Sequence, residues 1–79
     1  MTRTTETFAL FYGGDSLTVE YDGNMYVAPS CGAQYATRGD AMRQELYHYM
    51  IAGGDDLRAD DGSLDHVDLS EYGTWQDDD

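Results

Sequence analysis

Acidic residues are distributed unevenly along this 79-residue chain, and that distribution most constrains its fold. Residues 55–79 contain ten Asp or Glu and one arginine, Arg58, for a net charge of −9. Residues 1–54 contain six acids and three arginines, for a net charge of −3. The total is −12, and the chain contains no lysine. We therefore expect a nearly neutral scaffold in the first two-thirds, carrying a charged surface supplied by the last third.

The length allows one small domain, which we expect to span residues 1–75, with residues 76–79 as a disordered acidic tail. The chain is 41% hydrophobic and 13% aromatic, which favours a folded chain over a disordered acidic one. A single cysteine, Cys31, cannot form an intrachain disulfide and suits a reducing compartment. No apolar run approaches the ~20 residues of a membrane span, and residues 1–6 lack the apolar stretch of a signal peptide. We expect a cytoplasmic monomer.

Alternation of apolar and polar residues predicts an antiparallel sheet of three to four strands. In residues 17–22, Leu17, Val19 and Tyr21 are expected to face the core, with the intervening residues toward water. Residues 30–36 are expected to form a loop. Gly13-Gly14-Asp15 predicts a tight turn, and Asp22-Gly23 predicts a hairpin turn of type I′. Short runs rich in apolar residues predict the other strands, over residues 8–12 and 25–28. A fainter alternation of apolar and polar residues predicts a strand over residues 66–70.

One helix is predicted over about residues 40–52. Thr37 is suited to cap its start, and Gly53-Gly54 is a typical end. Apolar residues recur at helical spacing, namely Met42, Leu46, Tyr49 and Met50. A short sheet needs a covering layer, so the helix is expected to pack across one sheet face, giving an α+β fold.

Metal and catalytic motifs have little support. Placing Gly62 at the glycine position of an EF-hand loop puts Leu57 and Ala59 at ligand positions, so that motif fails. Calcium bound in another geometry stays open, through Asp55, Asp56, Asp60 and Asp61. The histidines and Cys31 lack zinc-site spacing. No nucleophile set or phosphate-binding loop is present, so we expect neither an enzyme nor a cofactor.

The acidic surface is the remaining candidate site, and we call residues 55–71 the acidic segment. With four basic residues in all, the chain is unsuited to binding nucleic acid or anionic membranes directly. Carboxylates a few residues apart match a basic DNA-binding surface instead, and tyrosines would add apolar contacts. Six apolar residues are expected to hold the segment on the core: Leu57, Leu64, Val67, Leu69, Tyr72 and Trp75. The predicted partner-binding residues are Asp55, Asp56, Asp60, Asp61, Asp65, Asp68 and Glu71, extended by Glu20 and Asp22. The tyrosines expected to be exposed are Tyr26, Tyr35, Tyr47 and Tyr72.

In size and in its clustered acidic face on a small α/β scaffold, the chain resembles the phage-encoded anti-CRISPR and DNA-mimic anti-restriction proteins. The resemblance is one of type and covers the whole chain without a shared motif. It implies an inhibitor of a bacterial defence complex, in particular of a type I CRISPR effector such as type I-C. The inhibitor would occupy the basic surface of a Cascade subunit that binds DNA or its PAM, in the cytoplasm of the infected host.

Two other interpretations stay open. A charge run is commonly a solvated face that keeps a small protein soluble, and absent lysine with abundant aspartate is typical of proteins adapted to high salt. The alternative function is therefore a small halophilic or calcium-binding regulatory module that pairs with a basic protein partner. The concentration of −9 of the −12 charges in the last 25 residues favours the inhibitor.

Overall fold

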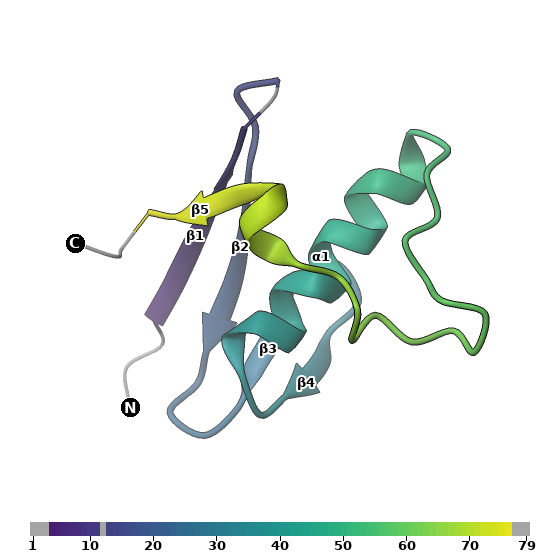
Figure 1. Ribbon diagram of the computed structural model, residues 1–79. Helices are drawn as coiled ribbons and strands as arrows, with labels where there is room; N and C mark the ends of the chain where they lie inside the picture. The colour runs from purple at the N-terminus through teal and green to yellow at the C-terminus, as the bar shows by residue number, and fades with distance from the viewer. Residues whose placement is uncertain (1–3, 12, 77–79) are drawn as a thin grey trace.

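The computed structural model describes residues 4–11 and 13–76, in which one helix packs on a five-stranded antiparallel sheet (Figure 1). This α+β architecture confirms the predicted fold class, with one strand more than the highest number expected. In chain order the elements are β1 (Thr4–Leu10), β2 (Ser16–Tyr21), β3 (Tyr26–Ala28), β4 (Ala33–Tyr35), α1 (Arg38–Ala52), the 3₁₀ helix η1 (Leu69–Glu71) and β5 (Gly73–Trp75).

The sheet has the strand order β4-β3-β2-β1-β5. The first four strands form a meander, and β5 returns from the far end of the chain to pair with the free edge of β1. The expectation of a loop over residues 30–36 is wrong at β4. Tyr35 there pairs with Tyr26 of β3, so that this short strand extends the sheet.

The core lies between α1 and the sheet face that it covers (Figure 1). Phe8 of β1 and Val19 of β2 are almost fully buried, as are Met42 and Leu46 of α1. Because Phe8 is opposite Leu17 in the register, these side chains share the covered face. The predicted inward direction of Val19 is confirmed.

Local signals set the ends of α1. The Thr37 side chain accepts a hydrogen bond from the Asp40 amide, which confirms the predicted cap, and the helix starts at Arg38, slightly earlier than expected. At the other end, the Gly54 amide donates to Ile51 and the Asp55 amide to Met50. Gly54 has a φ of 96°, so this is a Schellman motif that needs glycine.

Two details differ from the expectations for the helix and its sheet. Tyr49 is 37% exposed instead of packing in the core, because it lies at the edge of the apolar stripe, where its hydroxyl donates to Asp15. In the β2–β3 turn only Gly23 has a positive φ, so the turn is not type I′. The Asp22 carboxylate closes that turn by accepting the amides of Asn24 and Met25.

The expectation of a strand over residues 66–70 is wrong. The Asp68 side chain accepts the Ser70 amide and so caps η1, which ends the extended backbone there. The chain then enters β5 at Gly73, which is buried against β1. A Cβ atom at Gly73 would lie 2.0 Å from the Ala9 carbonyl oxygen, so only glycine allows this close approach. After β5 the Gln76 amide donates to Thr7, and Asp77–Asp79 of the expected tail lie outside the described residues.

Candidate functional site

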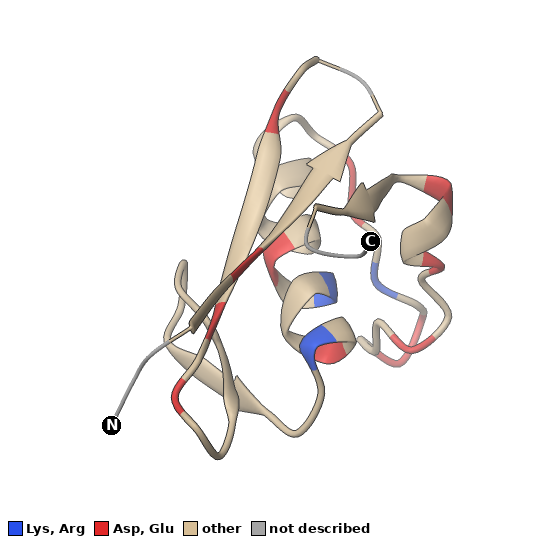
Figure 2. Ribbon diagram, turned by 90° about the vertical axis from the view of Figure 1, so that its left-hand side faces the viewer, with Lys and Arg blue, Asp and Glu red and all other residues tan. Residues whose placement is uncertain are grey.

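The acidic segment runs beside α1 as irregular backbone and then crosses the helix toward β5 (Figure 1). Figure 2 shows its acidic positions along this path, with the few arginine positions mainly on the helix. All of the predicted carboxylates within it are exposed, namely Asp55, Asp56, Asp60, Asp61, Asp65, Asp68 and Glu71. The segment therefore displays its charge to solvent, as expected.

Apolar residues fasten the acidic segment to the core. Val67 is buried within the core cluster, and the other five predicted anchors pack against it. Trp75 meets Phe8 edge to face at 5.2 Å, and the Arg38 guanidinium lies 4.2 Å over its ring. These contacts confirm the predicted anchors: Leu57, Leu64, Val67, Leu69, Tyr72 and Trp75.

Two arginines add polar contacts that the sequence did not predict. Arg43 of α1 donates from Nε to the Val67 carbonyl oxygen at 2.8 Å and from Nη1 to Asp40 at 3.0 Å. Arg58, inside the segment, lies 5.1 Å over the Tyr47 ring of α1. Arg43 therefore fixes the acidic segment near its C-terminal end, and Arg58 brings the N-terminal part of the segment into contact with α1.

The carboxylates of the segment differ in how they are engaged. Arg58 donates hydrogen bonds to Asp56 and lowers the pKa of that carboxyl to about 2. The Ser63 amide lowers the pKa of Asp61, and the Ser70 hydroxyl lowers that of Asp68.

The other four carboxylates of the segment are not engaged by any side chain that the structure describes. Among the described residues they form no ion pair and accept no side-chain hydrogen bond: Asp55, Asp60, Asp65 and Glu71. Among the described residues, Arg58 is the one cation that pairs with a carboxylate of the acidic segment. Most of the negative charge of the segment is therefore left for a partner.

The structure does not bring Glu20 and Asp22 to the acidic segment. Glu20 is opposite Val27 in the register and points to the sheet face away from α1. Asp22 is held in the β2–β3 turn, and the two regions lie far apart in Figure 1. If these residues contact a partner, they do so on another surface.

The four tyrosines expected to be exposed are half-buried. Tyr26 stacks on Tyr21 with ring centroids 4.6 Å apart, and Tyr47 packs beside His48. The remaining two, Tyr35 and Tyr72, pack against the core cluster. Burial raises the pKa of Tyr26 and of Tyr35. The four tyrosines therefore serve mainly in sheet and helix packing, with part of each side chain exposed.

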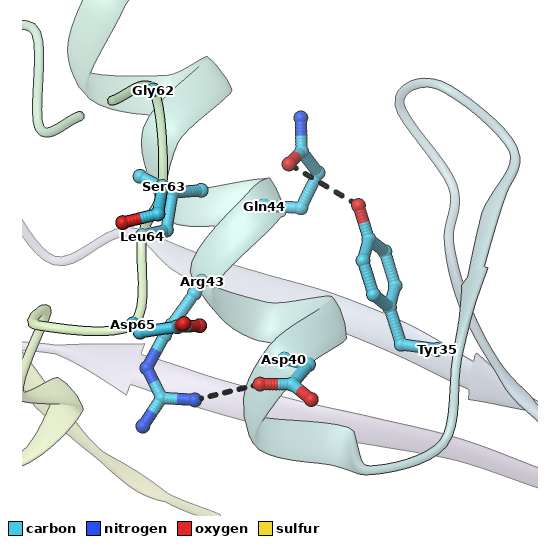
Figure 3. A pocket seen from close by; sticks show the side chains of 8 residues that line it. All are labelled: Tyr35, Asp40, Arg43, Gln44, Gly62, Ser63, Leu64 and Asp65. Carbon is cyan, nitrogen blue, oxygen red and sulfur yellow. Dashed lines mark hydrogen bonds and ion pairs between the residues drawn. The ribbon is translucent and has the colours of Figure 1, made fainter. Parts of the chain in front are cut away.

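A cavity of about 260 Å³ lies between α1, Tyr35 of β4 and the acidic segment (Figure 3). Its lining combines two carboxylates, Asp40 and Asp65, and the Arg43 guanidinium with amide, hydroxyl, aliphatic and aromatic groups. No signal in the sequence points to it, because residues 35–44 and 62–65 meet only through the packing of the segment on α1.

Neither a metal-binding cluster nor a membrane-spanning helix occurs in the described part of the chain. No group of three or more His, Cys, Asp or Glu side chains there is arranged to hold a metal ion. No helix within residues 4–11 and 13–76 has the length and apolar character needed to cross a membrane. Cys31 is exposed and has a free thiol.

Comparisons with protein-family models, with curated proteins and with solved structures found no match.

Proposed function

We propose that this protein is an inhibitor that occupies the basic DNA-binding surface of another protein through its acidic segment. The observation that carries the proposal is the exposure of seven carboxylates on residues 55–71, of which the described residues pair one with an arginine. The target that we propose is a DNA- or PAM-binding subunit of a type I CRISPR effector, type I-C in particular, in the cytoplasm of an infected bacterium.

The spacing of the carboxylates supports mimicry of a DNA strand. B-DNA presents one phosphate per ~3.4 Å of axis along each strand. Extended backbone advances by at most ~3.3–3.6 Å per residue, so acids a few residues apart lie within a few phosphate steps of one another. Aspartate has a short side chain, which keeps each charge close to a defined backbone position.

The attachment of the segment to α1 also supports the proposal. A surface that is ordered before binding loses less conformational entropy on association than a flexible tail does. The Val67 anchor and its hydrogen bond from Arg43 provide that order. The net charge of −12 would in addition attract a basic groove from a distance, with an association rate that falls as salt rises.

The test is displacement of a fluorescently labelled target duplex from a purified type I-C effector, followed by anisotropy. The test variant changes Asp60, Asp61, Asp65 and Asp68 to Asn, which removes four charges and keeps an acceptor oxygen at each position. A matched control removes four charges outside the acidic segment, by Asp15→Asn, Asp77→Asn, Asp78→Asn and Asp79→Asn.

We expect the unmodified protein and the control to displace DNA, and the test variant to lose at least about tenfold in potency, since each charge-assisted contact contributes to affinity. Failure of the unmodified protein to displace DNA would overturn the proposed target. Equal loss in the two variants would show that net charge acts without the acidic segment, which contradicts the proposal.

A further inference from the structure

The cavity beside the acidic segment has a floor and two walls from different parts of the chain (Figure 3). The floor is the face of α1 that bears Asp40, Arg43 and Gln44. Tyr35 stands on one side and residues 62–65 on the other. The volume of about 260 Å³ is below the ~300–1,000 Å³ of pockets that hold drug-sized ligands, and suits one inserted side chain.

Several of the donors that line the cavity are already engaged. Arg43 directs Nε to the Val67 carbonyl oxygen and Nη1 to Asp40. The Tyr35 hydroxyl donates to Gln44 at 3.2 Å, and the Gln44 side-chain amide nitrogen lies 3.0 Å from His48 Nε2. These contacts occupy the Tyr35 hydroxyl and two of the five N–H groups of Arg43.

The lining also presents carboxylate oxygens that are not engaged by any described residue. Asp65 forms no ion pair within the described residues, and Asp40 uses one of its two oxygens for Arg43. With two carboxylates and one arginine, the lining has a net charge of −1. A cavity of this composition selects a ligand that is positively charged and rich in donors.

We propose that the cavity receives an arginine side chain of the partner protein, with the guanidinium between Asp40 and Asp65 and the apolar stem against Tyr35 and Leu64. Arginine fits better than lysine because its planar group carries five donors, is weakly hydrated and stacks on aromatic rings. This inference rests on the proposed function, because it names one group of the basic partner that the acidic segment contacts.

The test uses the full-length ¹⁵N-labelled protein and N-acetyl-L-arginine amide as the probe, followed by NMR chemical shifts. We expect saturable shifts centred on the amides of Ser63, Leu64 and Asp65 and on the Gln44 side-chain amide. N-acetyl-L-citrulline amide, which has nearly the same shape without the charge, should give none, and N-acetyl-L-lysine amide should bind more weakly.

Two variants with the same change of net charge separate the cavity from the general field of the segment. Asp65→Asn should weaken probe binding about three- to fivefold, whereas Asp55→Asn, outside the cavity, should leave it nearly unchanged. Asp65 is exposed and makes no ion pair among the described residues, so its substitution is not expected to disturb folding.

Equal binding of the citrulline probe, equal effects of the two variants, or unsaturable shifts along the whole segment would each overturn the inference. These results are separable from failure of the proposed function. If the probe shows no site while the variant with four Asp→Asn changes still loses DNA displacement, the arginine site is excluded and the inhibitor proposal stands. If the probe binds as expected but the protein never displaces DNA, the site stands as an arginine site and the proposed target fails.

Discussion

The link between Arg43 and Val67 predicts how firmly the acidic segment is held. Arg43→Gln removes the 2.8 Å hydrogen bond to the Val67 carbonyl oxygen and the 3.0 Å pair with Asp40. A hydrogen bond from a charged donor contributes about 1.5–3 kcal/mol and a helix surface pair about 0.3–0.5 kcal/mol. Because the Arg43 side chain is 27% exposed, solvent reduces both, and we expect a loss of about 1–2 kcal/mol.

That loss corresponds to a fall in Tm of about 5–15 °C for a domain of this size. The assay is urea and thermal unfolding followed by Trp75 fluorescence, together with amide hydrogen exchange over residues 64–72. Arg58→Gln is the matched control, since it makes the same change of charge at an exposed pair within the segment. Exchange should accelerate in Arg43→Gln and much less in the control. Equal stability of the two variants would refute the argument that Arg43 fixes the segment.

Three further predictions address β5, the segment's charges and the alternative functions. Gly73→Ala should lower the free energy of unfolding in urea by about 1–3 kcal/mol, because the added Cβ atom would collide with Ala9. Gly39→Ala is the control and should cause no such loss, since the nearest atom to its Cβ lies 3.5 Å away. Equal urea midpoints of the two variants would contradict this prediction. Carboxyl NMR should show Asp56 with a pKa of about 2, and in Arg58→Gln with a pKa nearer 3.8. Because the pKa of Asp56 is lowered in the folded protein, this carboxylate stabilises the fold above the ordinary pKa of aspartate, and the contribution is lost as the pH falls through about 2. Thermal unfolding should be insensitive to calcium relative to magnesium, with a folded protein at low salt; calcium-specific stabilisation, or unfolding without molar salt, would favour the metal or halophilic module instead.

Elements with local signals could be predicted from the sequence. The period-two pattern of residues 17–22 corresponds to β2, and the Thr37 cap and Gly53-Gly54 give the ends of α1 to within two residues. At the helix ends the decisive interactions join residues within about five positions of each other, and β2 is specified by its own alternation of apolar and polar residues.

Elements that depend on distant partners could not be predicted. Residues 33–35 have little strand character of their own, and β4 forms through pairing with β3. Leu64 and Val67 fit helical spacing whereas Val67 and Leu69 fit strand spacing, so pattern alone could not place β5 at residues 73–75. Gly73 decides that position through its close approach to Ala9, which is 64 positions away in the sequence.

The candidate site divides in the same way. Charge counting predicted that the acids of residues 55–71 would be exposed, because such carboxylates are rarely buried without partners. It could not predict that the segment lies on the α1 side of the sheet, away from Glu20, nor that Arg43 bonds to Val67 across 24 positions. The cavity depends on that same packing and has no local sequence signal.

The most direct test of the central claim is to map the contact surface by hydrogen exchange in the complex with a type I-C effector. The irregular backbone of the acidic segment has few internal hydrogen bonds, so its free amides should exchange rapidly and any protection should be clear. We predict strong protection of residues 55–71 on binding, with the sheet face that bears Glu20 unchanged. Protection confined to β1 and β2, with the acidic segment exchanging as in the free protein, would contradict the account.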